Sequence, residues 1–327
     1  MRILGIDVSR RKFDAALLSE DGKMKHKVFA NTKTGFSKVL EWLDRQKANR
    51  VHACLESTGV YGEKLAYALA DAGHKVSVVN PARIKGFGQS ELSRTKTDKA
   101  DASLIARFCL ALNPEEWTPS PPHVRRLRER ARRLEALGDM LQQERNRLES
   151  AGDKEVRRSI QGVIAWIEQE MGTIRSAIRG EIDRHPDLRG KRDLLESIPG
   201  VGEATIVTIL AEFGSVEKFD NARQMAAFAG LVPRLYLSGS SVRGKTRLSK
   251  TGSSRIRKAL YMPALVAKKY NPILADFCER LQRAGKSPMA IIGAAMRKLI
   301  HIIYGVLKSG KPFDPDYHRT GKIQFAG

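Results

Sequence analysis

The sequence predicts an α/β domain followed by two helical segments. Within residues 1–116, short apolar runs typical of strands alternate with apolar residues at helical spacing. From residue 117 to residue 190, apolar residues recur in steps of three, four and seven, which indicates long helices. Residues 191–327 carry further helical patterns and few strand signals. We therefore expect three domains with these boundaries.

Three strands open the first domain. Arg2–Val8 is the first, and Phe13–Leu18 and Lys25–Ala30 flank a Glu-Asp-Gly turn typical of a hairpin. The next elements alternate: a helix over residues 36–43, a strand over 51–55, a helix between residues 59 and 73, and a strand over 75–79. A last helix begins at Thr97 and ends near Asn113.

Four acidic residues fall at the ends of these elements. Asp7 and Glu56 each end a predicted strand, while Asp98 and Asp101 lie three apart in a first helical turn and so share a face. Acids in a first turn also complement the helix dipole and cap free amides, which is an alternative explanation for the helical pair. Because ligands usually bind at strand ends of α/β sheets, the strand-end acids favour one metal-binding cluster.

The order of these elements is that of the ribonuclease-H-like, or RuvC-like, fold of Holliday-junction resolvases. There, acids at these places hold two divalent ions. Mg²⁺ prefers hard oxygen ligands, and two ions about 4 Å apart stabilise the attacking and leaving oxygens of phosphoryl transfer. Asp14, Asp21 and Glu63 fall in a strand, a turn and a helix surface. We do not expect these three acids in the site.

A Pro-rich segment after Trp117 marks the end of the first domain. Leucines then recur every seven residues from Leu127 to Leu148, and apolar residues from Ile160 to Ile178 recur in steps of four and three. These patterns predict a helical hairpin with coiled-coil seams. Residues 117–218 carry a net charge of only +1, which suits a second copy of the chain as partner; packing within one chain is an equal alternative.

The composition favours a folded protein that binds a polyanion. The chain has 58 Lys and Arg against 36 Asp and Glu, a net charge of +22, and 42% hydrophobic residues. Residues 219–327 alone carry +15, so we expect the main nucleic-acid surface there. Aromatic residues make up only 6%, so contacts of Arg and Lys with phosphates should outweigh base stacking.

The cysteines indicate neither a zinc site nor a disulfide framework. Cys54, Cys109 and Cys278 are scattered, and reduced thiols fit a cytoplasmic, nucleoid-associated protein. The N-terminus is charged too early for a signal peptide, and we expect no apolar run of membrane-spanning length.

The segment 198–202, Ile-Pro-Gly-Val-Gly, lies between two apolar helical patterns and is a helix-hairpin-helix signature. The amides of Gly200 and Gly202, with a helix N-terminus behind them, suit a phosphate. A simple turn between helices is the alternative.

A basic loop follows at residues 238–247. Arg243, Lys245 and Arg247 stand among small residues that allow close approach to a phosphodiester, although this composition is also common in flexible loops. Helices are expected over residues 254–269, 273–284 and 289–308. We expect Arg255, in the first of them, to bind nucleic acid, and His301, in the last, to be a core histidine with its hydrogen bonds satisfied.

Eight motifs spread in order over nearly the whole chain resemble those of bacterial insertion-sequence transposases of the DEDD-plus-serine type, the bridge-RNA-guided DNA recombinases. They are Gly5-Ile6-Asp7, Glu56-Ser57-Thr58-Gly59, Asn80-Pro81, Lys96-Thr97-Asp98-Lys99-Ala100-Asp101, Ile198-Pro199-Gly200-Val201-Gly202, Phe228-Ala229-Gly230-Leu231-Val232-Pro233, Ser238-Gly239-Ser240-Ser241-Val242-Arg243-Gly244 and Ala259-Leu260-Tyr261-Met262-Pro263.

The resemblance implies that Asp7, Glu56, Asp98 and Asp101 bind two Mg²⁺ ions and that Ser238 is the covalent nucleophile. Motif position favours Ser238 over Ser240 and Ser241. The resemblance also implies a structured non-coding bridge RNA that pairs with donor and target DNA, and assembly into dimers and a tetrameric synapse. Two alternatives are a metal nuclease of the Holliday-junction type with no covalent intermediate and a non-catalytic nucleic-acid scaffold.

Overall fold

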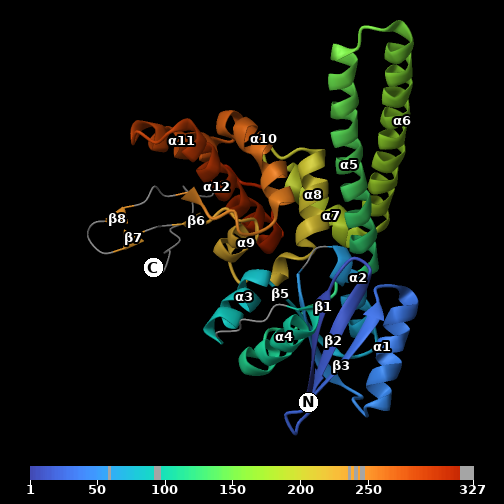
Figure 1. Cartoon of the computed structure of the whole chain (residues 1–327). Helices are drawn as coiled ribbons and strands as arrows, with labels where there is room; N and C mark the ends of the chain where they lie inside the picture. Colours follow the sequence, from blue (N-terminus) through green and yellow to red (C-terminus); the bar gives the residue numbers. More distant parts are fainter. Residues whose placement is uncertain (58–59, 92–96, 235–236, 239–241, 244–246, 317–327) are drawn as a thin grey trace. The chain divides into compact units, whose positions relative to one another are not determined.

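The computed structural model of the chain describes residues 1–57, 60–91, 97–234, 237–238, 242–243 and 247–316. The chain divides into two compact units, Met1–Pro119 and Ser120–Gly327 (Figure 1). The predicted boundary near residue 117 falls close to this division. The finer boundary near residue 190 stays a prediction.

The first unit contains a five-stranded sheet in the order β3-β2-β1-β4-β5. The strands are β1 (Arg2–Val8), β2 (Lys12–Leu18), β3 (Met24–Ala30), β4 (Val51–Glu56) and β5 (Lys75–Val79). Strand β4 pairs in parallel with both β1 and β5, whereas β2 pairs antiparallel with β1 and β3. This mixed sheet confirms the ribonuclease-H-like strand order that the sequence predicts.

Helices cover both faces of the sheet. They are α1 (Lys33–Arg45), α2 (Val60–Asp71), α3 (Pro81–Ser90) and α4 (Asp98–Leu112). Leu4 and Ile6 of β1 share a core with α1 and α2, while Ile3 and Cys54 share a core with α3 and α4. Because side chains alternate along a strand, Gly5 and Asp7 belong to the α4 face.

Helix α3 was not predicted. Asn80, which follows the strand over residues 75–79, is its N-cap and accepts a hydrogen bond from the amide of Ala82 at 2.9 Å. Pro81 occupies the first helical position, where a missing N–H costs nothing. Gly86 and Gly88 lower the helix propensity of the segment and mask its pattern.

The second unit is mainly helical. Its longer elements are α5 (Pro122–Ser150), α6 (Lys154–Arg184), α7 (Pro186–Glu196), α8 (Glu203–Phe213), α9 (Ala222–Phe228), α10 (Ser254–Tyr270), α11 (Pro272–Arg283) and α12 (Pro288–Ser309). A short 3₁₀ helix, η1, covers Val216–Lys218.

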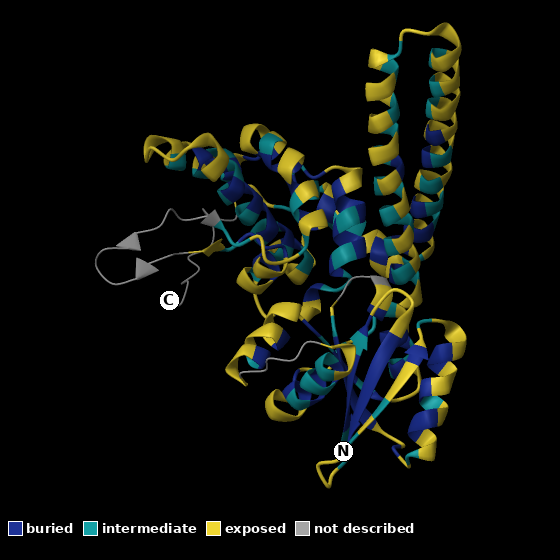
Figure 2. Ribbon diagram, in the orientation of Figure 1, coloured by how far each residue is buried: buried dark blue, intermediate teal, exposed yellow. Residues whose placement is uncertain are grey.

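Helices α5 and α6 form the predicted helical hairpin. Leu137 of α5 and Ile167 and Met171 of α6 are buried against one another, so this part of the seam is packed within one chain. Figure 2 shows exposed positions along the outer sides of both helices. In α6, Val163 and Trp166 are 41% and 50% exposed. A coiled-coil contact with a second copy remains a prediction.

Helix α12 corrects the expectation about membrane-spanning length. By length and composition alone, this helix of 22 residues is apolar enough to cross a membrane. Its apolar face, however, includes Ile291, Leu299 and Ile303, which are buried in the main core of the second unit. A core helix of this kind passes the same test, so α12 is weak evidence for a membrane span.

His301 of α12 also differs from expectation. Its Nε2 atom is buried and has no hydrogen-bond partner in the described part of the chain. Burial and the nearby charges of Arg297, Lys298 and Arg223 lower the pKa of His301 to about 4, so the ring is neutral at pH 7. The three cysteines are free and buried, as expected.

Candidate functional site

The first turn of α4 presents two of the predicted acids. The hydroxyl of Thr97, the N-cap residue, accepts a hydrogen bond from the amide of Ala100 at 3.2 Å. The helix therefore begins at Asp98, and Asp98 and Asp101 both lie in its first turn. Local capping chemistry alone thus places this pair as predicted.

A close backbone contact brings α4 onto β1. A Cβ atom added to Gly5 would lie 2.2 Å from the carbonyl oxygen of Ala102 and 2.3 Å from the amide nitrogen of Ala106. Only glycine allows a strand and a helix to approach this closely. Asp7 lies two residues beyond Gly5 on the same face of β1, so this contact brings it towards the first turn of α4.

The four predicted acids act on one another electrostatically. Burial and the charges of Asp101, Asp98 and Asp14 raise the pKa of Asp7 to about 6. Burial and the charges of Asp7 and Asp101 also raise the pKa of Glu56, which ends the neighbouring parallel strand β4. The structure thus brings all four into one electrostatic group at the ends of β1 and β4.

Asp14 is a fifth acid that sequence reasoning excluded. It lies directly opposite Asp7 in the antiparallel pairing of β1 and β2, and it is buried. Residues directly opposite in such a pair point to the same face. The signal was available in the sequence, because a tight turn between Val8 and Phe13 sets Asp7 against Asp14.

Lys12 is a second residue that sequence reasoning missed. Its Nζ atom lies 2.7 Å from Oδ2 of Asp98 and 3.4 Å from Oδ2 of Asp14. A hydrogen bond and the positive charge from Lys12 lower the pKa of Asp98. The acid cluster therefore carries one ammonium group of its own.

The donor set fits a divalent cation of the hard type. The acids offer carboxylate oxygens, and the raised pKa values of Asp7 and Glu56 show that their negative charges lack full compensation. In the described part of the chain, the three possible metal ligands whose ligand atoms all lie within 4.8 Å of one another are elsewhere, at His123, His185 and Asp187, so the ligand oxygens of the four acids are spaced more widely than that.

The cluster of His123, His185 and Asp187 is explained by hydrogen bonds. Nε2 of His123 lies 3.1 Å from Asp187, Nε2 of His185 lies 3.2 Å from Glu181, and the two imidazole rings stack at 4.3 Å. Imidazole does not suit Mg²⁺. We therefore interpret this cluster as a structural contact that ties α5 to the junction of α6 and α7.

The predicted basic loop contains paired strands. Strand β7 (Leu237–Ser238) pairs antiparallel with β8 (Val242–Arg243), and β6 (Pro233–Arg234) pairs with β9 (Arg247–Leu248). Ser238 lies opposite Val242. Lys245, Ser240 and Ser241 lie outside the described residues. Within the described residues of the segment, Ser238 thus belongs to a short strand paired antiparallel with β8.

The Pro-Gly-Val-Gly segment connects α7 to α8. Gly200 has φ +95°, and an added Cβ atom would lie 2.8 Å from the Cβ of Ala267 in α10, so packing explains this glycine. Gly202 is the N-cap of α8 and has open space around its Cβ position. The first residue of α8, Glu203, pairs with Arg179 at 2.6 Å. A phosphate contact at Gly202 stays a prediction.

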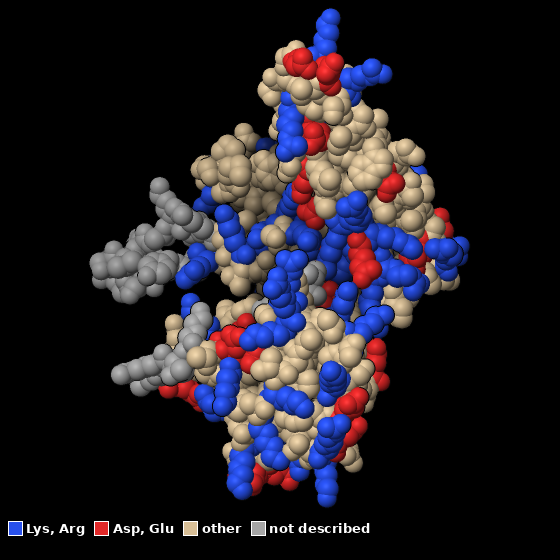
Figure 3. Space-filling model, turned by 45° about the vertical axis from the view of Figure 1, so that its right-hand side comes forward, with Lys and Arg blue, Asp and Glu red and all other residues tan. Residues whose placement is uncertain are grey.

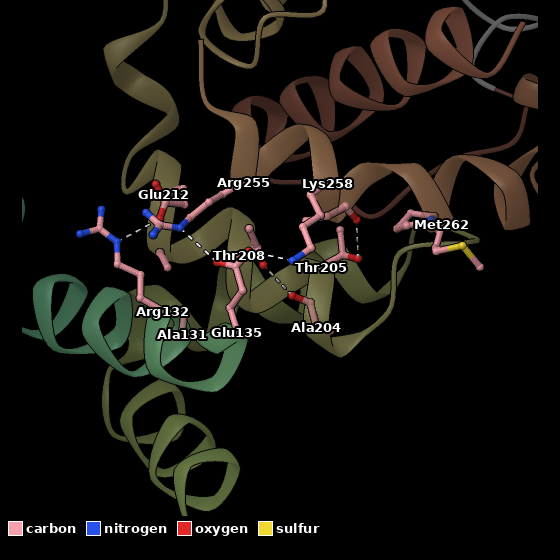
Figure 4. Close-up of a pocket in the computed structure, with 13 residues that line it drawn as sticks. Ala131, Arg132, Glu135, Ala204, Thr205, Thr208, Glu212, Arg255, Lys258 and Met262 are labelled. Carbon is pink, nitrogen blue, oxygen red and sulfur yellow. Dashed lines mark hydrogen bonds and ion pairs between the residues drawn. The ribbon is translucent and has the colours of Figure 1, made fainter. Parts of the chain in front are cut away.

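Arg255 lies in a groove lined by α5, α8 and α10 (Figure 4). Its Nε atom lies 3.1 Å from Oε2 of Glu135, and Lys258 reaches both Glu135 and Asp139. The charge of Arg255 is thus partly compensated by α5. Lysine and arginine side chains are nevertheless spread over the visible surface of both units (Figure 3).

Comparisons with known proteins decide the family. A sequence profile described as "Transposase" matches residues 4–153, and one described as "Transposase IS116/IS110/IS902 family" matches residues 192–279. A pilin gene-inverting protein of Moraxella bovis is 33% identical over 319 residues, which covers 96% of this chain and 98% of that protein. The chain belongs to the IS110/IS116 family of transposases. This confirms the resemblance read from the motifs.

A pilin gene-inverting protein of Moraxella lacunata resembles this transposase to the same extent, with 33% identity and 98% coverage of that protein. Among solved structures, RuvC of Thermus thermophilus aligns with 36% of the transposase and 99% of its own chain, at 18% identity and a TM-score of 0.26. The fold assignment therefore depends on the sheet order. As a transposase, the chain belongs to a class of enzymes that cleave and rejoin DNA.

Proposed function

We propose that this transposase cleaves and rejoins DNA at a Mg²⁺-dependent site formed by Asp7, Glu56, Asp98 and Asp101. The observation that carries the proposal is the gathering of these acids at the ends of β1 and β4, where burial, together with the charges of Asp101 and Asp98, raises the pKa of Asp7 to about 6. A group of carboxylates that repel one another at neutral pH binds a divalent cation favourably.

In this proposal Ser238 is the nucleophile. Its Oγ atom forms a bond to the phosphorus of a DNA phosphodiester, the bond from phosphorus to one deoxyribose oxygen breaks, the serine proton is lost and the released oxygen gains a proton. A serine hydroxyl is a poor nucleophile until it is activated. Bound divalent ions supply charge stabilisation to such a transfer.

Arg243, Lys245 and Arg247 are proposed to hold the phosphate beside Ser238, since Arg forms bidentate hydrogen bonds to phosphate. The net charge of +15 in residues 219–327 supports this placement. Gly200, Gly202 and Arg255 are proposed as further nucleic-acid contacts. To bind a phosphate, Arg255 must give up its ion pair with Glu135.

We further propose that a structured bridge RNA selects donor and target DNA and that dimers assemble into a tetramer. The acids lie in the first unit and Ser238 in the second. A site shared between protomers would make cleavage depend on assembly. The exposed Val163 and Trp166 on α6 support a partner at the hairpin, because exposed apolar side chains often mark interfaces.

The test mixes two inactive variants, Ser238→Ala and Asp98→Asn, with RNA, DNA and Mg²⁺. A shared site predicts recovered recombination and a denaturation-resistant DNA adduct on the Asp98→Asn subunit. Co-assembled variants that stay inactive would place the whole site within one chain. RNA that co-purifies with the wild type would be sequenced in the same preparation, and its absence would contradict guidance by RNA.

A Holliday-junction-type metal nuclease is the second candidate, because the acid cluster is complete within the ribonuclease-H-like unit. Such an enzyme releases free DNA ends and never becomes linked to DNA. Cleavage by Ser238→Ala at the wild-type rate, with no adduct in the wild type, would favour the nuclease.

A further inference from the structure

Lys12 occupies a position in the acid cluster that nothing above assigns to a function. It is the first residue of β2, and its Nζ atom contacts Asp98, which is 86 positions away in the sequence. The same Nζ atom lies 3.4 Å from Asp14. One ammonium group therefore joins an acid of the helix α4 to an acid of the sheet.

The contact with Asp98 conflicts with metal binding at the same oxygen. Oδ2 of Asp98 lies 2.7 Å from the ammonium, whereas Mg²⁺ takes its oxygen ligands at about 2.1 Å and tolerates little distortion of its octahedral shell. The ammonium and the ion would share one carboxylate oxygen, and their positive charges would repel each other at that distance. An ion at Oδ2 of Asp98 is therefore bound more favourably once Lys12 has left that oxygen.

Asp14 keeps the displaced ammonium nearby. The carboxylate of Asp14 is 12% exposed, and the strand pairing of β1 and β2 holds it opposite Asp7. Lys12 itself is 47% exposed, so its side chain is able to move between the two carboxylates. An ammonium that leaves Asp98 therefore still has a carboxylate partner at the edge of the acid cluster.

We propose that Lys12 is a counter-cation of the acid cluster that a divalent ion displaces from Asp98. Asp14 then holds the ammonium group of Lys12 in position to bind a non-bridging oxygen of the DNA phosphodiester. This rests on the proposed metal site. Lys12 thereby links occupancy of the metal site to a free positive charge for the substrate. Without metal, the same ammonium lowers the repulsion among the acids.

Calorimetric titration of the full-length protein with Mn²⁺, without nucleic acid, tests the first step. Lys12→Gln removes the competitor and should tighten Mn²⁺ binding by about two- to fivefold, the range for an exposed ion pair. Lys12→Arg keeps the charge and should bind as the wild type does. Lys99→Gln is the matched control. Lys99 is exposed and adjacent to Asp98 in the sequence, but among the described contacts it forms no ion pair with Asp98.

Equal or weaker Mn²⁺ binding by Lys12→Gln would overturn the competition. So would an equal tightening in Lys99→Gln, since that result would indicate a general effect of charge. Asp98→Asn separates the failure of the metal site from the failure of the role of Lys12. If the Mn²⁺ heat of the wild type persists in Asp98→Asn, the ion binds elsewhere and both proposals fall.

DNA cleavage at saturating Mn²⁺ tests the second step. Lys12→Gln should cleave DNA at least tenfold more slowly than the wild type, although it binds metal more tightly. A tenfold change in rate corresponds to roughly 1.4 kcal/mol. Lys12→Arg should retain most of the wild-type rate. If Lys12 had a purely structural role, Lys12→Gln would weaken Mn²⁺ binding and slow DNA cleavage together. Cleavage by Lys12→Gln at the wild-type rate would contradict the proposed contact between Lys12 and the DNA phosphate.

Discussion

Gly5→Ala is expected to damage the proposed metal site without changing an acidic residue. The added methyl group would lie 2.2 Å from a carbonyl oxygen of α4, whereas an ordinary contact of this kind is longer than 3.4 Å. Because the obstructing atoms belong to the helix backbone, α4 and β1 must separate by about 1 Å, and overpacking of this kind costs about 1–3 kcal/mol. The separation also moves Asp101 away from Asp7.

Urea unfolding followed by tryptophan fluorescence measures this cost. Trp42 and Trp117 belong to the first unit, and Trp166, in the second, is already half exposed. With a slope of about 1–3 kcal/mol per molar urea, a loss of about 3 kcal/mol lowers the midpoint by about 1–3 M. Mn²⁺ affinity should fall in the same variant.

Gly86→Ala is the matched control. Gly86 lies in α3, and an added Cβ atom would meet nothing within 4 Å. The change from Gly to Ala in a helix interior should stabilise the first unit by up to about 1 kcal/mol and leave Mn²⁺ binding unchanged. An unchanged urea midpoint and unchanged Mn²⁺ affinity in Gly5→Ala would refute the role of the close contact.

Three further predictions concern pH and packing. Because the pKa of Asp7 is raised, the folded protein binds more protons than the unfolded chain between pH 3.8 and about 6, and its stability falls as pH rises through that window. Asp7→Asn should therefore stabilise the metal-free protein at pH 7 by about 1–2 kcal/mol after allowance for solvent screening. Thermal unfolding in EDTA measures this gain. Burial opposes ionisation of Glu181, but hydrogen bonds from Arg126 and Arg130 outweigh burial and hold the pKa of Glu181 at about 2. The ionised carboxylate therefore stabilises the fold above pH 4.5, and this stabilisation is lost as pH falls towards 2. Glu181→Gln should flatten the curve of stability against pH between 4.5 and 2, and an unchanged curve would contradict this. Ile167→Asp places a charge in the buried seam of α5 and α6 and should cost several kcal/mol, with loss of helical signal by circular dichroism. Trp166→Asp, at a neighbouring position that is 50% exposed, should not.

Features set by neighbouring residues were predictable from the sequence. Thr97 and the acids after it carry their own capping signal, so the start of α4 was predicted correctly. The strand order followed from hydrophobic runs and one turn signal. In each case the information lies within a few residues of the element.

Features set by distant contacts were missed. Asp14 and Lys12 join the site through the register of a hairpin and an ion pair to a helix 86 residues away. Gly200 carries a glycine because Ala267 of α10 packs against it, which no local pattern records. The paired strands around Ser238 are only two residues long, too short for an alternating pattern to be read.

The central place of β1 in the sheet has a consequence for the newly made chain. One edge of β1 pairs with β2 within the first 18 residues, but its other edge pairs with β4, which begins at Val51. Until the ribosome has delivered β4, that apolar edge has unpaired amides and carbonyls, which are prone to join other chains. The acids at positions 98 and 101 are synthesised later still, so a prematurely terminated fragment of this transposase lacks half of the proposed metal site.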